Sequence, residues 1–253
     1  MARPADSSVD PGPVPDVAVV DGHGRLPGDL AAELMDVLAD EHDIVVCDLH
    51  AMAAPTSAEE VLAPAADYLE HWTGTTVVVS VPDPEVQRKV LTGAGPGQVV
   101  VADSVEAGLA EAQARHHQVR RVSEQLAPVP TASRDARRFV ARTLLDWQLP
   151  RLVPPAVLVV SELVTNSVVH AVTVVDLTLT QADSLLRIAV RDHGGSRPAP
   201  RSAPTAESTL SGRGLLIVQA LTRCWGVFPG RGSGKTVWAV LDAATPRERQ
   251  VPA

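Results

Sequence analysis

The stretch Ser161–Ala171, with the sequence SELVTNSVVHA, decides what kind of fold the second half of the chain forms. Its periodicity predicts a helix, in which Glu162, Asn166 and His170 recur at every fourth position along one side. The remaining positions are mostly apolar, and a polar group in an apolar setting costs free energy unless a partner satisfies it. These three side chains therefore meet either other groups of the protein or a ligand.

The segments on both sides of this helix predict an α+β unit. Its expected elements are a helix at 134–149, the helix containing the opening stretch at 150–172, a hairpin at 174–193, a helix at 212–223 and a second hairpin at 224–242. This order indicates a mixed, antiparallel-rich sheet with helices on one face, which is a two-layer sandwich.

The first half of the chain predicts a different class of fold, because strand-like and helix-like stretches alternate in it. The expected strands are 16–20, 43–49, 75–81 and 98–103, and the expected helices are 27–41, 57–72, 83–91 and 104–126. Such alternation is typical of an α/β unit with a mostly parallel sheet. The expected domain plan is a flexible tail at 1–14, an α/β unit at 15–117, a helix and linker at 118–130, an α+β unit at 131–243 and a tail at 244–253.

The composition of the chain limits the classes of partner it can bind and indicates its location in the cell. The net charge of −8 argues against a general nucleic-acid or anionic-membrane binder. No run of eighteen or more apolar residues is present, so no membrane-spanning helix is expected. Cys47 and Cys224 each lie in an apolar, strand-like stretch and are expected to be buried thiols rather than a disulfide or a metal site. These features predict a cytoplasmic protein.

Three further motifs of the second unit carry polar or glycine residues at the ends of expected elements. Asp192 and Gly194 follow a strand in VRDHGG, where a carboxylate accepts hydrogen bonds and glycine permits close approach. Gly212 and Gly214 open a helix in SGRGLLIV, and a helix N-terminus suits phosphate. Thr236 opens the last strand. Taken singly, each motif is more often structural than functional.

Lys235 precedes Thr236 in GRGSGKT, which imitates the end of a phosphate-binding loop. The full pattern of such a loop is absent, and the stretch lies between two expected strands with no helix after it. We therefore reject a phosphate-loop function for this segment.

The order and spacing of the four motifs together resemble the GHKL ATPase family, which includes the histidine kinase ATP-binding domain, gyrase B, Hsp90 and MutL. SELVTNSVVHA, VRDHG, GRGLLIV and GKTVWAVL are most similar to the anti-sigma-factor serine kinase type, particularly its short actinobacterial forms. The resemblance covers about residues 131–243.

This resemblance implies ATP and Mg²⁺ as ligands and gives each motif a role. Asn166 would coordinate the Mg²⁺ that bridges the phosphates, which agrees with the preference of this ion for oxygen ligands and retained water. Glu162 would orient or deprotonate the attacking hydroxyl or water. Asp192 would bind the adenine amino group, with Gly194 giving close approach.

The remaining implied contacts lie around the phosphates and the base. Gly212 and Gly214 would wrap the phosphates, and Thr236 would support the adenine–aspartate contact through water. The segment 194–212 would form a lid over the nucleotide, because its Ser-, Pro- and Gly-rich composition is typical of a mobile loop. This segment and its end carry three arginines, of which the one between the glycines could reach phosphate: Arg197, Arg201 and Arg213.

The first unit resembles a STAS domain, the fold of the anti-sigma-factor antagonists, by pattern rather than by fixed residues. The family's acceptor segment, Asp-Ser-Ser/Thr-Gly, is replaced here by PTSAE, which keeps Thr56 and Ser57 but lacks the aspartate and the glycine. Ser57 with Glu60 three residues later also matches a helix capping box. We expect little or no phosphorylation at Thr56 or Ser57, and a domain that binds partners or docks on its neighbour.

These features predict an ATP-dependent protein serine/threonine kinase that phosphorylates a STAS antagonist partner. The alternative is a module that sequesters a sigma factor or antagonist in the presence of ATP without catalysis. Glu162 favours the kinase, because binding alone requires only Asn166, Asp192 and the glycines. A second copy of the chain, as a homodimer, is a further candidate partner.

Overall fold

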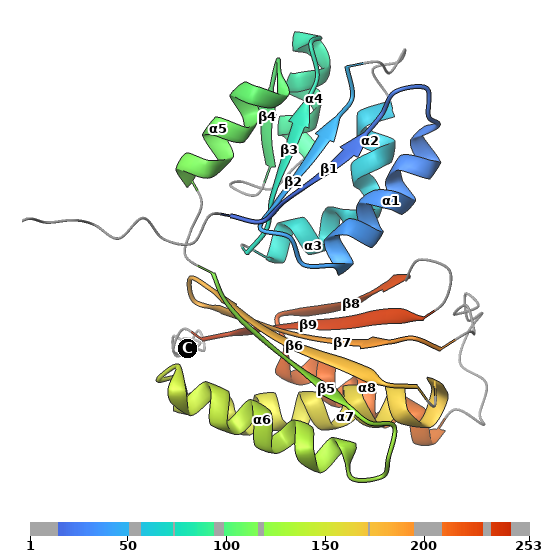
Figure 1. Ribbon diagram of the computed structural model, residues 1–253, viewed down its shortest axis with the longest axis vertical. Coiled ribbons are helices and arrows are strands. Elements are labelled where there is room, and N and C mark those ends of the chain that lie inside the picture. Colours follow the sequence, from blue (N-terminus) through green and yellow to red (C-terminus); the bar gives the residue numbers. More distant parts are fainter. Residues whose placement is uncertain are drawn as a thin grey trace, which may run out of the picture.

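The protein folds into two units, each built around its own sheet, with one unit stacked on the other (Figure 1). This computed structural model describes residues 15–50, 57–72, 74–93, 99–115, 119–171, 173–194, 209–229 and 234–243. We call the described residues up to 115 the first unit and those from 119 onward the second unit.

The first unit is an α/β layer with a four-stranded, all-parallel sheet of order β1-β2-β3-β4, as the sequence predicts. Its strands are β1 (Val17–Asp21), β2 (Ile44–Asp48), β3 (Thr76–Ser80) and β4 (Val99–Ala102). Its helices are α1 (Pro27–Ala39), α2 (Ser57–Leu62), η1 (Ala63–Ala65), α3 (Ala66–His71), α4 (Pro84–Gly93) and α5 (Val105–Arg115).

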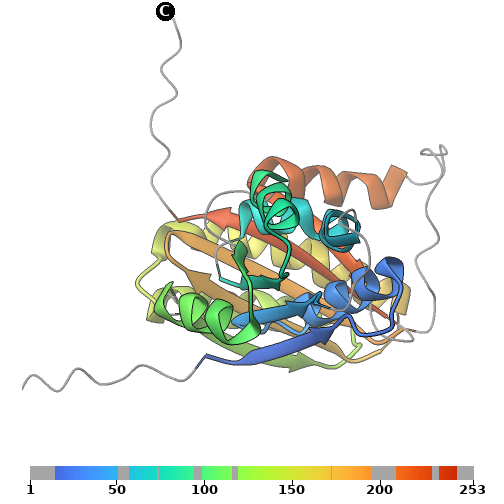
Figure 2. The same cartoon turned by 90° about the horizontal axis from the view of Figure 1, so that it is seen from above.

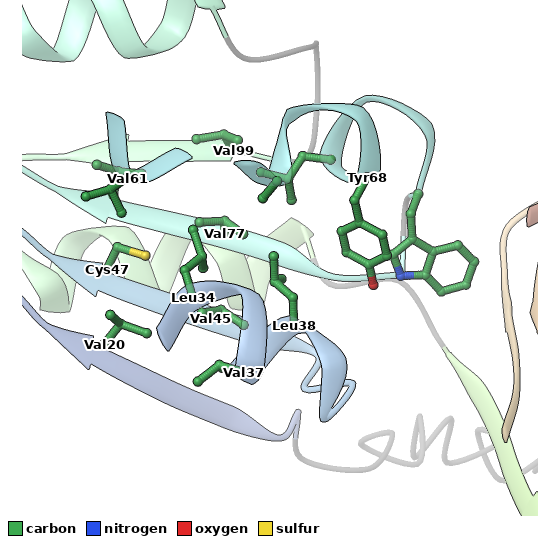
Figure 3. Packing of buried hydrophobic residues seen from close by; sticks show 14 of the residues in the cluster. Val20, Leu34, Val37, Leu38, Val45, Cys47, Val61, Tyr68, Val77 and Val99 are labelled. Atoms are coloured by element: carbon green, nitrogen blue, oxygen red, sulfur yellow. The ribbon is translucent and has the colours of Figure 1, made fainter. Parts of the chain in front are cut away.

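Helices cover both faces of this sheet, which explains why its central strands are continuous apolar runs. α1 lays Leu34 and Leu38 over Val45 and Val77 on one face (Figure 3). On the other face, Ala112 of α5 packs in a separate apolar cluster, whose buried strand members are Ile44, Val46, Val78 and Val100.

The second unit has a five-stranded, all-antiparallel sheet of order β5-β6-β7-β9-β8, covered on one face by helices (Figure 1). Its strands are β5 (Arg120–Leu126), β6 (Val175–Ala182), β7 (Leu185–Asp192), β8 (Cys224–Pro229) and β9 (Lys235–Asp242). Its helices are α6 (Ala132–Asp146), η2 (Pro150–Leu152), α7 (Val153–Ala171) and α8 (Thr209–Leu221). The α+β layer with helices on one face is the one that the sequence predicts, but the expected mixed sheet is wrong, because every described strand pair in it is antiparallel.

The expected long helix at 104–126 is wrong, because α5 ends at Arg115 and residues 120–126 form strand β5. β5 pairs antiparallel with β6, from Arg120 opposite Gln181 to Leu126 opposite Val175. Val122 and Leu126 are four residues apart, a spacing that suits one side of a helix and one face of a strand equally. The segment assigned to a helix and linker at 118–130 therefore contributes a strand to the second sheet.

One helix among the described residues is long and apolar enough to cross a membrane by length and composition alone. It is the helical stretch Pro150–Val169, with a mean hydropathy of 1.7. Core helices of soluble proteins pass the same test. Here Val159, Val160 and Val164 are fully buried in the core between the helices and the second sheet.

The two cysteines form no disulfide. Cys47 is fully buried in β2, and this burial raises the pKa of its thiol to about 12, so the reactive thiolate is disfavoured. Cys224 is only half-buried at the start of β8. The expectation of a buried thiol is thus confirmed for Cys47 and not for Cys224.

The first unit covers one face of the second sheet, and the helices of the second unit cover the other face (Figure 1 and Figure 2). One apolar core continues across this boundary, so that Tyr68 packs edge-on against Phe228 and Trp238, with ring centroids 5.0 and 5.1 Å apart. Burial raises the pKa of the Tyr68 hydroxyl. Because the contact is apolar at its centre, the two units are not independent bodies joined by a linker.

A buried ion pair also crosses the boundary. Glu41 follows α1 with a left-handed φ of 66°, and its carboxylate enters the second unit. It accepts from Arg187 Nη1 at 2.5 Å and from Thr180 Oγ1 at 2.8 Å. Burial is the largest effect on the Arg187 pKa and lowers it, but the attraction of Glu41 leaves this pKa raised overall.

Candidate functional site

The polar side of α7 faces away from the core of the second unit. Glu162 and Asn166 are partly exposed, whereas Leu163, Val164 and Ser167 are buried. Within the described part of the chain, neither Glu162 nor Asn166 has a hydrogen-bond or ion-pair partner. Their polar groups are thus not satisfied by the core, which leaves them available to a ligand. The side chain of His170 lies outside the described residues.

Helix α8 crosses α7 at Glu162, where Gly214 permits close contact. A Cβ atom added to Gly214 would lie 2.3 Å from Glu162 Oε2. No side chain larger than hydrogen fits there unless the carboxylate moves. Gly214 and Glu162 are therefore brought together by the packing of the two helices.

Asp192 ends β7 as a carboxylate that is only 2% exposed. Its Oδ2 accepts from Lys235 Nζ at 2.7 Å, and its Oδ1 accepts from the Gly194 backbone N–H at 3.4 Å. Gly194 itself packs against the end of α7, because a Cβ atom there would lie 2.8 Å from Ala171 Cβ. The turn after β7 thus brings Asp192 and Gly194 to the C-terminal end of the helix that carries Glu162 and Asn166.

Thr236 does not join this group, which corrects the sequence-based expectation. In the β7–β9 ladder, Asp192 pairs with Lys235, and Arg191 pairs with Thr236. Paired residues share a face, so Lys235 lies beside Asp192 and Thr236 lies with Arg191 on the face turned to the first unit. The sequence does not indicate whether Lys235 or Thr236 pairs with Asp192, because β9 is apolar on both of its faces further along.

The side chain of Thr236 instead lines a cavity of about 180 Å³ at the boundary between the two units. Asp40, Glu41, Arg121 and Arg191 are among the other residues of its wall. The Thr236 hydroxyl is buried and has no hydrogen-bond partner among the described residues. Thr236 therefore belongs to the contact between the units and not to the surroundings of Asp192.

The glycines of the third motif lie inside α8 and not before it. The helix begins at Thr209, so Gly212 falls in its first turn and Gly214 in its second. The first four N–H groups of a helix lack intrahelical partners, and Gly214 comes after them. Gly214 thus leaves room for the side chain of Glu162, and its backbone N–H is not free to bind a phosphate in this helix. The side chain of Arg213, and the segment 195–208 with the other two arginines, lie outside the described residues.

The described residues of the site offer few ligands to a metal ion. The described residues contain no group of three or more His, Cys, Asp or Glu side chains that could hold a metal ion. The Asn166 carboxamide alone would be a poor site for Mg²⁺, which prefers near-octahedral oxygen ligands and keeps several waters. Phosphate oxygens would supply the missing ligands.

The two glycines that approach the site most closely should respond differently to alanine. In Gly214→Ala the clash is with the flexible end of Glu162, and the helix gains up to about 1 kcal/mol from alanine. In Gly234→Ala the Cβ atom would meet the Asp192 carbonyl oxygen at 2.1 Å with φ at +93°, which costs on the order of 1–3 kcal/mol or more.

Denaturant unfolding of the full chain measures the difference. We expect Gly214→Ala to match or exceed the wild type in free energy of unfolding and Gly234→Ala to fall clearly below it. An equal loss of free energy of unfolding in both variants would contradict this expectation, because it would show that the Glu162 carboxylate cannot move away from the added methyl group.

The geometry of the second unit agrees with a comparison against known families. Residues 122–241 match the family model of the histidine kinase-like ATPase domain. The matched segment begins in β5 and ends in β9, so it contains nearly all of the second sheet, the helices α6, η2, α7 and α8, and every candidate site residue. The match supports a GHKL-type, ATP-binding domain in this unit. No curated protein gave a significant match to the chain.

Proposed function

We propose that the histidine kinase-like ATPase unit binds ATP with Mg²⁺ and that the protein is a serine/threonine kinase of the anti-sigma-factor type. The observation that carries the proposal is the buried carboxylate of Asp192, placed near the end of the helix that bears Glu162 and Asn166. A carboxylate withdrawn from water is costly unless donors surround it. Lys235 and Gly194 supply two donors, and an amino group of adenine would supply a further one.

Phosphoryl transfer in this site would use two groups of α7. The hydroxyl oxygen of the acceptor forms a bond to the γ-phosphorus as the bond from that phosphorus to the β–γ bridging oxygen breaks, and ADP leaves. Glu162 orients this hydroxyl and receives its proton. Asn166 would hold Mg²⁺ that arrives with the nucleotide, and the charge supplied by that ion would offset the negative charge of the phosphates.

The acceptor would be a separate protein, a STAS antagonist, and a sigma factor would be a second partner. We assign the first unit to the STAS-like class because of its alternating pattern and parallel sheet. Its α2 begins at Ser57, whose side chain lies outside the described residues, as does the whole of Thr56. The location proposed for this protein is the cytoplasm.

Asp192→Asn should weaken the binding of ATP and ADP about tenfold to a hundredfold. The substitution removes a charged hydrogen-bond acceptor, and hydrogen bonds to charged groups contribute about 1.5–3 kcal/mol. Calorimetric titration of the full chain with Mg-ATP measures the change. Asp16→Asn is a control, because Asp16 is also paired with a base, His42, but lies in the first unit. Absence of binding to the wild type at millimolar ATP would overturn the proposal.

A further inference from the structure

Lys235 lies beside Asp192, and the function proposed above gives its side chain no role in binding the nucleotide. Its Nζ lies 2.7 Å from Asp192 Oδ2, and its side chain is 26% exposed while that of Asp192 is 2% exposed. The ammonium group therefore sits at the edge of the site, between the buried carboxylate and the solvent side. The inference below rests on the proposed binding of ATP and concerns how the base is recognised.

The backbone of β9 fixes where Lys235 lies. Lys235 pairs with Asp192 in the ladder, so the two side chains leave the sheet on the same face. Gly234 precedes it with φ at +93° and no room for a Cβ atom beneath the Asp192 carbonyl. A residue on a regular strand, next to a backbone conformation that favours glycine, is held more precisely than one on a loop.

The pair presents a hydrogen-bond acceptor next to a donor. An ionised carboxylate has about four lone-pair sites, of which Lys235 and Gly194 use two. An ammonium group has three N–H donors, and among the described residues Lys235 uses one of them, on Asp192. Both groups thus keep capacity for a ligand while bonded to each other.

Adenine has the complementary pattern along one edge. Its 6-amino group is a donor, and the neighbouring ring nitrogen N1 is an acceptor. We propose that Lys235 donates to adenine N1 while Asp192 accepts from the 6-amino group, so that the protein reads the base directly at two adjacent atoms. Guanine has an acceptor at position 6 and a donor at N1, so in the same pose both contacts would become repulsive. Lys235 is thus a specificity-determining residue.

The competing interpretation is that Lys235 only neutralises Asp192 in the empty site and moves away when a nucleotide enters. The two interpretations differ at one atom of the ligand. If Lys235 contacts N1, replacing that nitrogen by C–H must weaken binding; if Lys235 leaves, the replacement has no such effect.

Calorimetric titration of the full chain with ATP and with 1-deaza-ATP tests the contact at N1. We expect wild type to bind 1-deaza-ATP roughly tenfold to a hundredfold more weakly than ATP, the range for a charged hydrogen bond. Lys235→Met should bind the two nucleotides equally, at about the wild-type level for 1-deaza-ATP. Purine riboside triphosphate, which lacks the 6-amino group, should lose affinity in both proteins because Asp192 remains.

The outcomes separate this inference from the function on which it rests. Equal affinity of the wild type for ATP and 1-deaza-ATP overturns the role of Lys235 and leaves ATP binding intact. Failure of the wild type to bind ATP overturns both. The wild-type comparison needs no variant, so the test holds even where Lys235→Met does not fold.

Discussion

Replacing Arg187 by methionine is expected to lower the free energy of unfolding of the full chain by about 3–5 kcal/mol. Arg187 is 1% exposed and holds the buried carboxylate of Glu41 at 2.5 Å. Its guanidinium also lies over the ring of Tyr68, 5.4 Å from the centroid. Methionine keeps much of the side-chain volume but leaves the negative charge of Glu41 buried without its main partner. Denaturant unfolding monitored by tryptophan fluorescence measures the loss.

Two companion variants show whether charge burial is the cause. Glu41→Gln combined with Arg187→Met removes both charges and keeps an acceptor for Thr180, so the double variant should be more stable than Arg187→Met alone. Asp40→Asn breaks the neighbouring pair with Arg191, whose side chains are 38% and 35% exposed, and should cost less than about 1 kcal/mol. Equal losses in Arg187→Met and Asp40→Asn would contradict the buried-charge explanation.

The contact between the two units limits which surfaces of the second unit a partner protein can bind. Because Tyr68, Phe228 and Trp238 share one core with the ion pair beside it, the first unit belongs to the fold of the second and should unfold with it in one transition. A partner protein cannot reach the covered face of the sheet while the units stay docked. The helix face, with Glu162 and Asn166, stays accessible at its edge.

The class of each unit could be predicted from local patterns, because buried strands and amphipathic helices differ in period. The partly exposed polar side of α7, with Glu162 and Asn166, followed from a four-residue spacing in an apolar stretch that is too long for a strand. Asp192 and Gly194 followed from a strand that ends in a polar residue and glycine. In each case neighbouring positions in the sequence contain the information.

The features that the sequence did not predict depend on distant pairing. β5 has a spacing compatible with a helix, and only the hydrogen bonds to β6 make it a strand. The choice between Lys235 and Thr236 depends on the register of β9 against β7, which no local pattern encodes. Glu41 and Arg187 each appear as ordinary surface charges in the sequence, although together they are buried between the units.

Glu162→Ala is expected to reduce phosphoryl transfer by about 10²–10⁴-fold and to leave the affinity for Mg-ATP within a few-fold of the wild type. In the proposed mechanism this carboxylate acts on the attacking hydroxyl and does not hold the nucleotide, so its loss should affect the rate and not the binding. Incubation with labelled ATP and candidate STAS antagonists measures transfer, and slow hydrolysis to ADP measures attack by water when no acceptor is present.

Three further variants test whether a lower rate in Glu162→Ala comes from the loss of its carboxylate. Gly214→Ala displaces the same carboxylate without removing it, so it should lower the rate in the same direction while the fold is retained. Asn166→Ala should weaken Mg²⁺-dependent binding, which Glu162→Ala does not. Asp16→Asn, which breaks a pair with His42 in the first unit, should change neither quantity. Equal rates in the wild type and Glu162→Ala would remove Glu162 from the mechanism, and a wild type that binds ATP but neither transfers nor hydrolyses it would be a non-catalytic binding module.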